Sequence, residues 1–168
     1  MSDCLVRIRQ AKADDAEALS RVFEAAWREA YRGIIPGLAL EKMLLRRGEG
    51  WWRSTVSRGR PMAVLDLGQG VAGYASYGRC RNQALPADGE IDELYVLPEC
   101  QGIGFGRRLF KAVLNDLKAR DMSRVLLWAL ADNERACAFY DGLGGTVIAR
   151  VEERIGGTAL AKIAYLFR

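Results

Sequence analysis

Three glycines within five positions separate a strand-like segment from a helical one. Residues 101–107 read QGIGFGR; they follow a strand-like segment, 91–97, that Pro98 ends, and they precede an amphipathic helical pattern. The apolar stripe of that helix consists of Leu109, Phe110, Val113, Leu114 and Leu117. Glycine lets a backbone approach an anion closely, and a helix N-terminus presents free N–H groups. The sequence therefore predicts a strand, a phosphate-binding turn and a helix in that order.

The spacing of the glycines excludes two nucleotide-binding motifs. A dinucleotide-binding GxGxxG would need glycine at position 107 or 109, where Arg107 and Leu109 stand. A Walker A loop would need a GK[ST] ending, which the chain lacks here. The predicted phosphate ligand is therefore bound by a different kind of loop.

Hydrophobic periodicity predicts a mixed order of helices and strands around one core. The expected strands cover residues 5–9, 62–65, 71–77, 91–97, 125–130, 146–154 and 159–167. The first expected helix starts at Asp14–Asp15, whose carboxylates are expected to cap its N-terminus. Further helices are expected at 38–45, at 51–56, after the glycine-rich turn and at 133–140. This order predicts an α/β (α+β) fold with a mixed sheet, and the length predicts a single domain spanning 1–168.

Composition removes several classes of chemistry. The chain contains no histidine, so Ser-His-Asp and Cys-His systems and HExxH zinc sites are excluded. Cys4, Cys80, Cys100 and Cys137 lack metal-ligand or CxxC spacing and are expected to be reduced thiols. The net charge of +4 comes mostly from arginines dispersed along the chain. A nucleic-acid-binding protein would concentrate this charge, so we expect no nucleic-acid partner. Residues 1–4 do not begin a signal peptide, and no membrane segment is expected, so we predict a cytoplasmic protein.

Two motifs resemble those of GNAT superfamily N-acetyltransferases. Residues 101–106 match motif A, Q/R-x-x-G-x-G/A, and residues 133–144 match the segment N-x-x-A-x-x-x-Y-x-x-x-G at the expected distance. The specific resemblance covers Glu90 to Gly144. Gly145 departs from it, because the family usually has Phe there. The resemblance implies a mostly antiparallel central sheet with helices on both faces and a splayed parallel strand pair that holds acyl-CoA.

The same resemblance implies acetyl-CoA as the acyl donor and no metal. Its expected binding residues are Tyr95, Val96, Gln101, Gly102, Ile103, Gly104, Phe105, Gly106, Arg107 and Asn133. In such enzymes the loop backbone binds the pyrophosphate, and the strand near Tyr95 pairs with the pantetheine arm. Tyr140 matches the tyrosine that protonates the leaving thiolate. A buried core tyrosine is the alternative reading of that residue.

A carboxylate is expected to act as the general base, because histidine is absent. Glu90, Asp92 and Glu93 lie on the central strand, where alternation places Glu90 and Asp92 on one face and Glu93 on the other. Counting back from Gln101, the family resemblance favours Asp92 first and Glu90 second. Glu93 is expected to bind a cationic acceptor or to pair with an arginine.

The acceptor is expected to be a primary amine, with a small molecule favoured over a protein N-terminus or lysine. By resemblance, the helical segments before residue 60 and the terminal hairpin border the acceptor end of the cleft. Trp27, Tyr31, Trp51 and Trp52 are candidates for its lining or for the core. A non-catalytic acyl-CoA sensor is the alternative from another class. The terminal hairpin also offers a sheet edge for a homodimer.

Overall fold

The computed structural model describes residues 5–168, so the predictions for the N-terminus and Cys4 lie outside the described residues. The strands are β1 (Arg7–Gln10), β2 (Met62–Asp66), β3 (Val71–Arg79), β4 (Gly89–Val96), β5 (Val125–Leu130), β6 (Thr146–Ile155) and β7 (Thr158–Phe167). The helices are α1 (Ala16–Tyr31), α2 (Gly37–Leu45), α3 (Glu49–Ser57), α4 (Phe105–Ala119) and α5 (Glu134–Gly142), with short 3₁₀ turns at Ala13–Asp15 and Pro98–Cys100. The predicted order of elements is confirmed.

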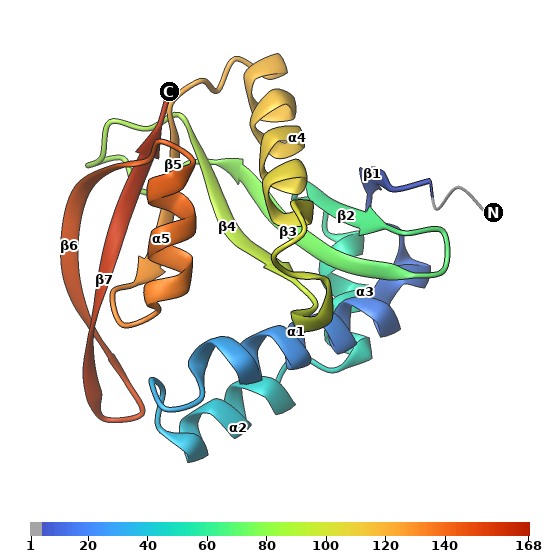
Figure 1. Ribbon diagram of the computed structural model, residues 1–168, viewed down its shortest axis with the longest axis horizontal. Helices are drawn as coiled ribbons and strands as arrows, with labels where there is room; N and C mark the ends of the chain where they lie inside the picture. The colour runs from blue at the N-terminus through green and yellow to red at the C-terminus, as the bar shows by residue number, and fades with distance from the viewer. Residues whose placement is uncertain (1–4) are drawn as a thin grey trace.

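The strands form one mixed sheet in the order β1-β2-β3-β4-β5-β7-β6 (Figure 1). Only β4 and β5 are parallel neighbours, and the other pairs in this sheet are antiparallel. The mostly antiparallel sheet expected from the sequence is therefore confirmed. The strand before the glycine-rich turn, β4, lies at its centre.

The two parallel strands part soon after they begin. They pair only at Gly89 with Val125, at Glu90 with Leu126 and at Ile91 with Leu127. Beyond these residues β4 keeps pairing with β3, whereas β5 keeps pairing with β7. The free edge of β4 past Ile91 therefore faces a gap, which is the splayed pair that the family resemblance implies.

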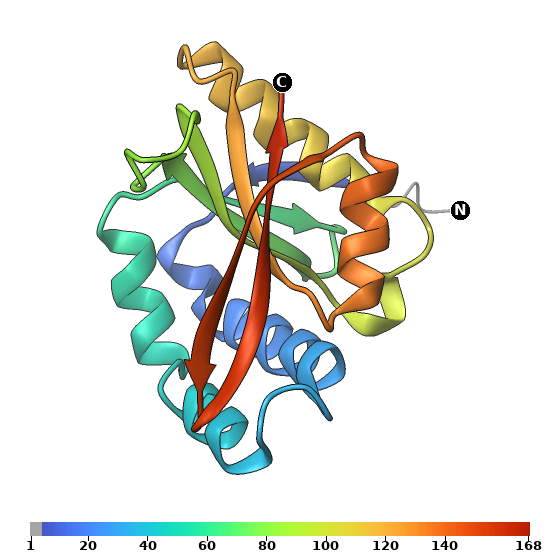
Figure 2. The same ribbon diagram turned by 90° about the vertical axis from the view of Figure 1, so that its left-hand side faces the viewer.

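Helices cover both faces of the sheet (Figures 1 and 2). The apolar stripe of α1, with Leu19, Val22 and Phe23, packs in one core with α2, α3 and β3. The stripe of α4, with Leu109 and Phe110, packs with α5 and the ends of β5 and β7 in a second core. Burial of these two stripes fixes α4, and with it the glycine-rich turn, against β4.

The start of α1 differs from the prediction in its capping. Asp15 precedes the helix, but its side chain does not cap it. The carboxylate instead accepts hydrogen bonds from the backbone N–H of Lys12 at 2.7 Å and from the Arg9 guanidinium at 2.8 and 2.9 Å. These bonds hold β1 to the beginning of the helical region.

Gly145 is explained by the packing of the last strand. A Cβ at this position would lie 2.8 Å from Cζ of Phe167 and 2.9 Å from Cδ1 of Tyr165. The two β7 rings thus occupy the space beside position 145. The Phe that the family usually has there would find no room in this chain.

The β6–β7 hairpin reaches down to the helices of the opposite end (Figure 2). Its turn contains Gly156, and a Cβ there would lie 2.6 Å from the Cβ of Ala39 in α2. Gly156 also has a φ of +59°, a value that glycine adopts without strain. The hairpin and the helices α1 to α3 therefore enclose the space in front of the splayed strands.

Candidate functional site

A pocket of about 540 Å³ lies where β4 and β5 part. One side carries Asp92, Glu93 and Tyr95 from β4, and the other carries Trp128 to Leu130 from β5. The remaining lining residues are Trp27, Tyr31, Arg47, Trp51, Trp52, Thr55, Arg60, Met62, Ser76, Arg81, Glu153 and Lys162. The divergence of the two strands thus opens a cavity rather than a gap that core side chains fill.

The aromatic residues predicted for the acceptor pocket all line it. Trp27, Tyr31, Trp51 and Trp52 come from α1 and α3, and they form edge contacts among themselves. The hydroxyls of Tyr31 and Tyr95 lie 2.7 Å apart and share a hydrogen bond. Burial raises the pKa of both phenols, so each keeps its proton at neutral pH.

The face assigned to Glu93 was wrong. Ser76 pairs with Glu93 and Tyr77 pairs with Ile91, so Asp92 is an extra residue without a partner in β3. Such a β-bulge breaks the alternation of side chains, because two residues of one strand oppose one of the other. Asp92 and Glu93 therefore both line the pocket.

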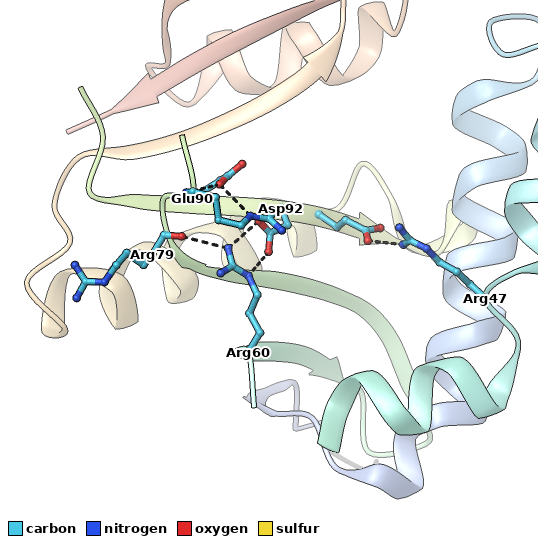
Figure 3. A network of polar contacts seen from close by, with 7 residues as sticks. Arg47, Arg60, Arg79, Glu90 and Asp92 are labelled. Atoms are coloured by element: carbon cyan, nitrogen blue, oxygen red, sulfur yellow. Dashed lines mark hydrogen bonds and ion pairs between the residues drawn. The ribbon is translucent and has the colours of Figure 1, made fainter. Parts of the chain in front are cut away.

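Asp92 is held by two arginines (Figure 3). Arg60 donates from Nε to Oδ2 at 2.6 Å and from Nη2 to Oδ1 at 2.9 Å, and Arg81 donates from Nη2 to Oδ1 at 2.8 Å. The paired carboxylate raises the pKa of Arg60 further. A carboxylate oxygen accepts about two hydrogen bonds, so Oδ1 is filled and Oδ2 keeps one acceptor position.

Glu90 lies on β4 two residues before Asp92, is only 8% exposed and does not line the pocket. Its Oε2 accepts a hydrogen bond from the backbone N–H of Arg81 at 3.2 Å and lies 3.6 Å from Nε of the same residue. Within residues 5–168, its Oε1 has no hydrogen-bond partner. Arg81 therefore connects Glu90 and Asp92, the two carboxylates that the sequence favours as base.

Glu93 connects the sheet to the helices above it. Its Oε1 pairs with Arg47, and its Oε2 accepts a hydrogen bond from the Tyr74 hydroxyl at 2.9 Å. The Arg47 guanidinium also lies over the rings of Phe23 and Trp51, at 4.9 and 4.7 Å from their centroids. Of the two roles expected for Glu93, pairing with an arginine is therefore the one observed.

The glycine-rich turn leaves several backbone donors free. Gly102 and Gly104 have φ of +78° and +90°, and a Cβ on either would meet nothing within 4 Å. The first helical bond of α4 runs from Arg108 N to Gly104 O. Among the described residues, none accepts from the N–H groups of residues 104–107. This open helix N-terminus suits an anionic group.

Two residues predicted to bind the cofactor have structural contacts. The Gln101 side chain donates from Nε2 to the Val96 carbonyl at 2.9 Å, which ties the turn to the end of β4. Asn133 precedes α5, and its Oδ1 accepts a hydrogen bond from the Ala136 N–H at 3.2 Å. Direct binding of the cofactor by their side chains stays a prediction.

Tyr140 is buried in the core that α5 forms with α4 and β7, and it does not line the pocket. Its ring packs against Phe110, Phe139, Tyr165 and Phe167. Burial raises the pKa of Tyr140, so the phenol holds its proton at neutral pH. No residue in the described part of the chain accepts a hydrogen bond from its hydroxyl.

Sequence reasoning missed the cations and one aromatic residue of the pocket. Arg60 and Arg81 flank strands in the chain, Lys162 lies on β7, and Trp128 lies in a run that predicts a fully buried strand. Trp128 gave a weak signal, because it is a bulky residue with an indole N–H near the end of an otherwise aliphatic strand. Arginines in loops give no such signal, because solvated surfaces have the same composition.

Two searches of residues 5–168 gave negative results. No group of three or more cysteine, aspartate or glutamate side chains is placed to hold a metal ion there. In the same range, no helix has the length and apolar character needed to cross a membrane. Cys80, Cys100 and Cys137 are free thiols.

The geometry defines a class of protein. A glycine-rich turn with free N–H groups follows β4, and a pocket opens beside that strand where β5 leaves it. The turn suits the phosphates of a cosubstrate, and the exposed edge of β4 suits an extended arm. Together with the two sequence motifs, these features are those of an acyl-CoA-dependent acyltransferase.

Comparison with known proteins gives the family. The acetyltransferase (GNAT) family matches residues 19–145. An uncharacterized N-acetyltransferase of Bacillus subtilis, YuaI, is 29% identical over 159 residues, covering 95% of this chain and 91% of its own. The chain therefore belongs to the GNAT acetyltransferase family and is an acyl-CoA-dependent N-acetyltransferase.

Solved structures show the same fold. The PaiA N-acetyltransferase of Thermoplasma acidophilum, in complex with coenzyme A, matches with a TM-score of 0.75 and 18% identity over 94% of this chain and 97% of that one. The acetyltransferase yncA of Salmonella typhimurium, with acetyl-CoA, matches with a TM-score of 0.69 and 21% identity over 97% and 93%. At these identities the likeness concerns the fold.

Proposed function

We propose that the chain, as one domain over residues 1–168, acetylates the primary amine of a small molecule by direct attack in a ternary complex with acetyl-CoA. The observation that carries this proposal is the position of the pocket. It opens between β4 and β5 where they part, beside the strand edge next to which the donor would lie. Donor and acceptor would thus meet in one cavity.

The residues near the end of β4 suit the donor. Backbone N–H groups of residues 102–107 would bind its pyrophosphate, whereas that of Gln101 already donates to the Pro98 carbonyl at 3.2 Å. The edge of β4 at Tyr95 and Val96 would pair with its arm. Two observations support this assignment: the donors of residues 104–107 are free, and the space above Gly102 and Gly104 is open. When bound, acetyl-CoA supplies the acetyl group as a thioester.

Proton transfer is assigned to Tyr140 and to the carboxylates of β4. Tyr140 holds its proton at the hydroxyl oxygen and serves as the general acid for the leaving thiolate. Asp92 accepts the proton of the amine, directly or through water, at the open position of Oδ2. Glu90 is the second candidate, because its Oε1 has no partner in residues 5–168.

The size and enclosure of the pocket favour a small acceptor. Helices α1 and α3 form one wall, and Glu153 and Lys162 of the terminal hairpin form another. A volume of about 540 Å³ lies within the range of pockets for small molecules. A lysine side chain or N-terminus on a folded protein would have to enter past these walls.

The proposal is tested by calorimetric titration with acetyl-CoA, followed by release of free thiol in the presence of amines. Two variants isolate the loop, Gly104→Asp and Gly104→Asn, because both side chains meet the same backbone φ but only one carries a charge. At close range the added charge repels a phosphate by about 1–4 kcal/mol. The Asp variant should therefore bind acetyl-CoA at least about fivefold more weakly than the Asn variant. Equal affinities would move the donor away from this loop.

A further inference from the structure

The charges that line the pocket are already paired with one another. Its carboxylates are Asp92, Glu93 and Glu153, and its cations are Arg47, Arg60, Arg81 and Lys162. Each of these three carboxylates forms an ion pair with a lining cation. A polycationic acceptor such as a polyamine would need unpaired carboxylates, and its extra charges would face these cations. The pocket therefore suits an acceptor that brings an anionic group together with its amine.

Two of the cations flank the point where the strands part. Ile91 and Leu127 are the last paired residues, so Asp92 and Trp128 are the first beyond the pairing. Arg81 binds Asp92 on one side. On the other side, Nζ of Lys162 lies 4.9 Å from the centroid of the Trp128 ring. A cation thus lies on each side of the start of the gap.

Arg81 has donors to spare. Its side chain is 67% exposed, in contrast to 34% for Arg60, which binds the same carboxylate. A guanidinium carries five N–H groups, and Arg81 uses Nη2 for Asp92 and Nε for its ion pair with Glu90. In the portion of the chain that the structure describes, Nη1 of Arg81 has no acceptor. It is therefore available to an anion that enters the pocket.

We propose, resting on the acetyltransferase function above, that the acceptor is a free α-amino acid with an apolar or aromatic side chain. Its carboxylate binds Arg81 and Lys162, and its amine lies at the open position of Asp92. The amine and the carboxylate of an α-amino acid share one carbon, so the two groups reach neighbouring partners at the same time. The N-terminus of a protein lacks this carboxylate.

The rest of the pocket suits the side chain of such an acceptor. Beyond the charged residues, the wall is largely aromatic, with Trp27, Tyr31, Trp51, Trp52 and Tyr95. Aromatic walls bind apolar surface and stack with rings. A charged side chain would have to compete with the existing ion pair between Arg47 and Glu93.

The test compares each amino acid with its own amide. Phenylalanine, methionine and leucine are assayed against their amides, with phenethylamine and spermidine as amines without a carboxylate. The amide keeps the amine and the side chain but removes the anion. We expect kcat/KM for at least one amino acid to exceed that for its amide by about tenfold to a hundredfold, the range for a charged hydrogen bond. Amides that match their acids, or spermidine as the best acceptor, would refute the proposal.

Variants assign the selectivity to its residues. Arg81→Gln and Lys162→Met should each lower the acid-to-amide ratio toward one. Because Arg81→Gln also removes a hydrogen bond to Asp92, it is expected to change both rates, and the ratio is the readout. Damage to the fold would lower both rates together, so this ratio separates recognition from stability. Arg79→Gln is the matched control, because Arg79 ends β3 nearby but does not line the pocket. Its ratio should equal that of the wild type.

Binding of acetyl-CoA distinguishes failure of the acetyltransferase function from failure of the amino-acid acceptor class. It is measured by calorimetry on the same preparations before the acceptors are assayed. Tight binding together with acid-to-amide ratios near one would leave the acetyltransferase function in place and reject the amino-acid class. Absence of acetyl-CoA binding would reject the function itself.

Discussion

Replacing Tyr140 with Phe should remove turnover while leaving the protein folded and able to bind acetyl-CoA. The ring of Tyr140 is 6% exposed and packs within a cluster of four other aromatic side chains. Phe keeps all of these contacts. Because no residue among 5–168 accepts a bond from the hydroxyl, its removal breaks no hydrogen bond inside the described chain.

The expected magnitudes follow from this environment. The free energy of unfolding should change by less than about 0.5 kcal/mol, because a typical lost hydrogen bond costs about 1 kcal/mol and none is lost here. Turnover should fall about 10²- to 10⁴-fold, the usual contribution of a general acid. The structure thus predicts a large effect on kcat with almost none on stability.

Tyr165→Phe is the matched control, because it removes the same atom from the same cluster. Tyr165 is 2% exposed, and its hydroxyl donates to the Cys137 carbonyl at 3.4 Å. Loss of this bond should cost about 0.5–1.5 kcal/mol, which lowers Tm by roughly 1–6 °C in a chain of this size. Turnover should stay near that of the wild type.

Denaturant unfolding, calorimetry with acetyl-CoA and initial rates on the two variants measure these effects together. Unchanged kcat in Tyr140→Phe would remove Tyr140 as the acid. A loss of stability above about 1.5 kcal/mol in that variant would mean that the hydroxyl has a partner in the folded chain, as a core tyrosine would.

Two further predictions concern stability. Arg9 lowers the pKa of Asp15 below its ordinary value of 3.8, so the pair stabilises the fold above that pH and the contribution is lost as the pH falls through the lowered value. Asp15→Asn should therefore cost about 1–3 kcal/mol at pH 7 in denaturant unfolding, with a smaller difference from the wild type below pH 3.8. Gly145→Ala should cost about 1–3 kcal/mol, because its Cβ would lie within 3 Å of Phe167 and Tyr165; an unchanged Tm would show that the rings move aside at no cost.

Local signals in the sequence were sufficient for the elements and for the loop. The apolar stripes of α1 and α4 and the run 125–130 have the periodicity of the structures they form. The loop 101–107 was predictable because its glycines and the helix after it are contiguous. Each of these features depends on residues close together in the chain.

Features that depend on distant residues were not predictable from the pattern. The bulge at Asp92 exists only in the pairing of β4 with β3, and it turned Glu93 to the pocket side. Period-two alternation, applied to β4 alone, gives the wrong face from that residue onward. A single unpaired residue therefore changed the assignment of one of three candidate carboxylates.

The arginines have the larger consequence for function, because they change what the carboxylates of β4 can do. In the sequence alone, Glu90, Asp92 and Glu93 indicate an acidic cleft that would attract a cationic acceptor. Asp92 is instead bound by Arg60 and Arg81, which approach from a loop before β2 and a loop after β3. Paired in this way, a carboxylate offers a bound amine a place for its proton but little net charge for a second cation. The charge balance of the pocket therefore depends on arginines that the fold brings to β4. The acidic residues of β4 alone would predict the wrong charge and, with it, the wrong class of acceptor.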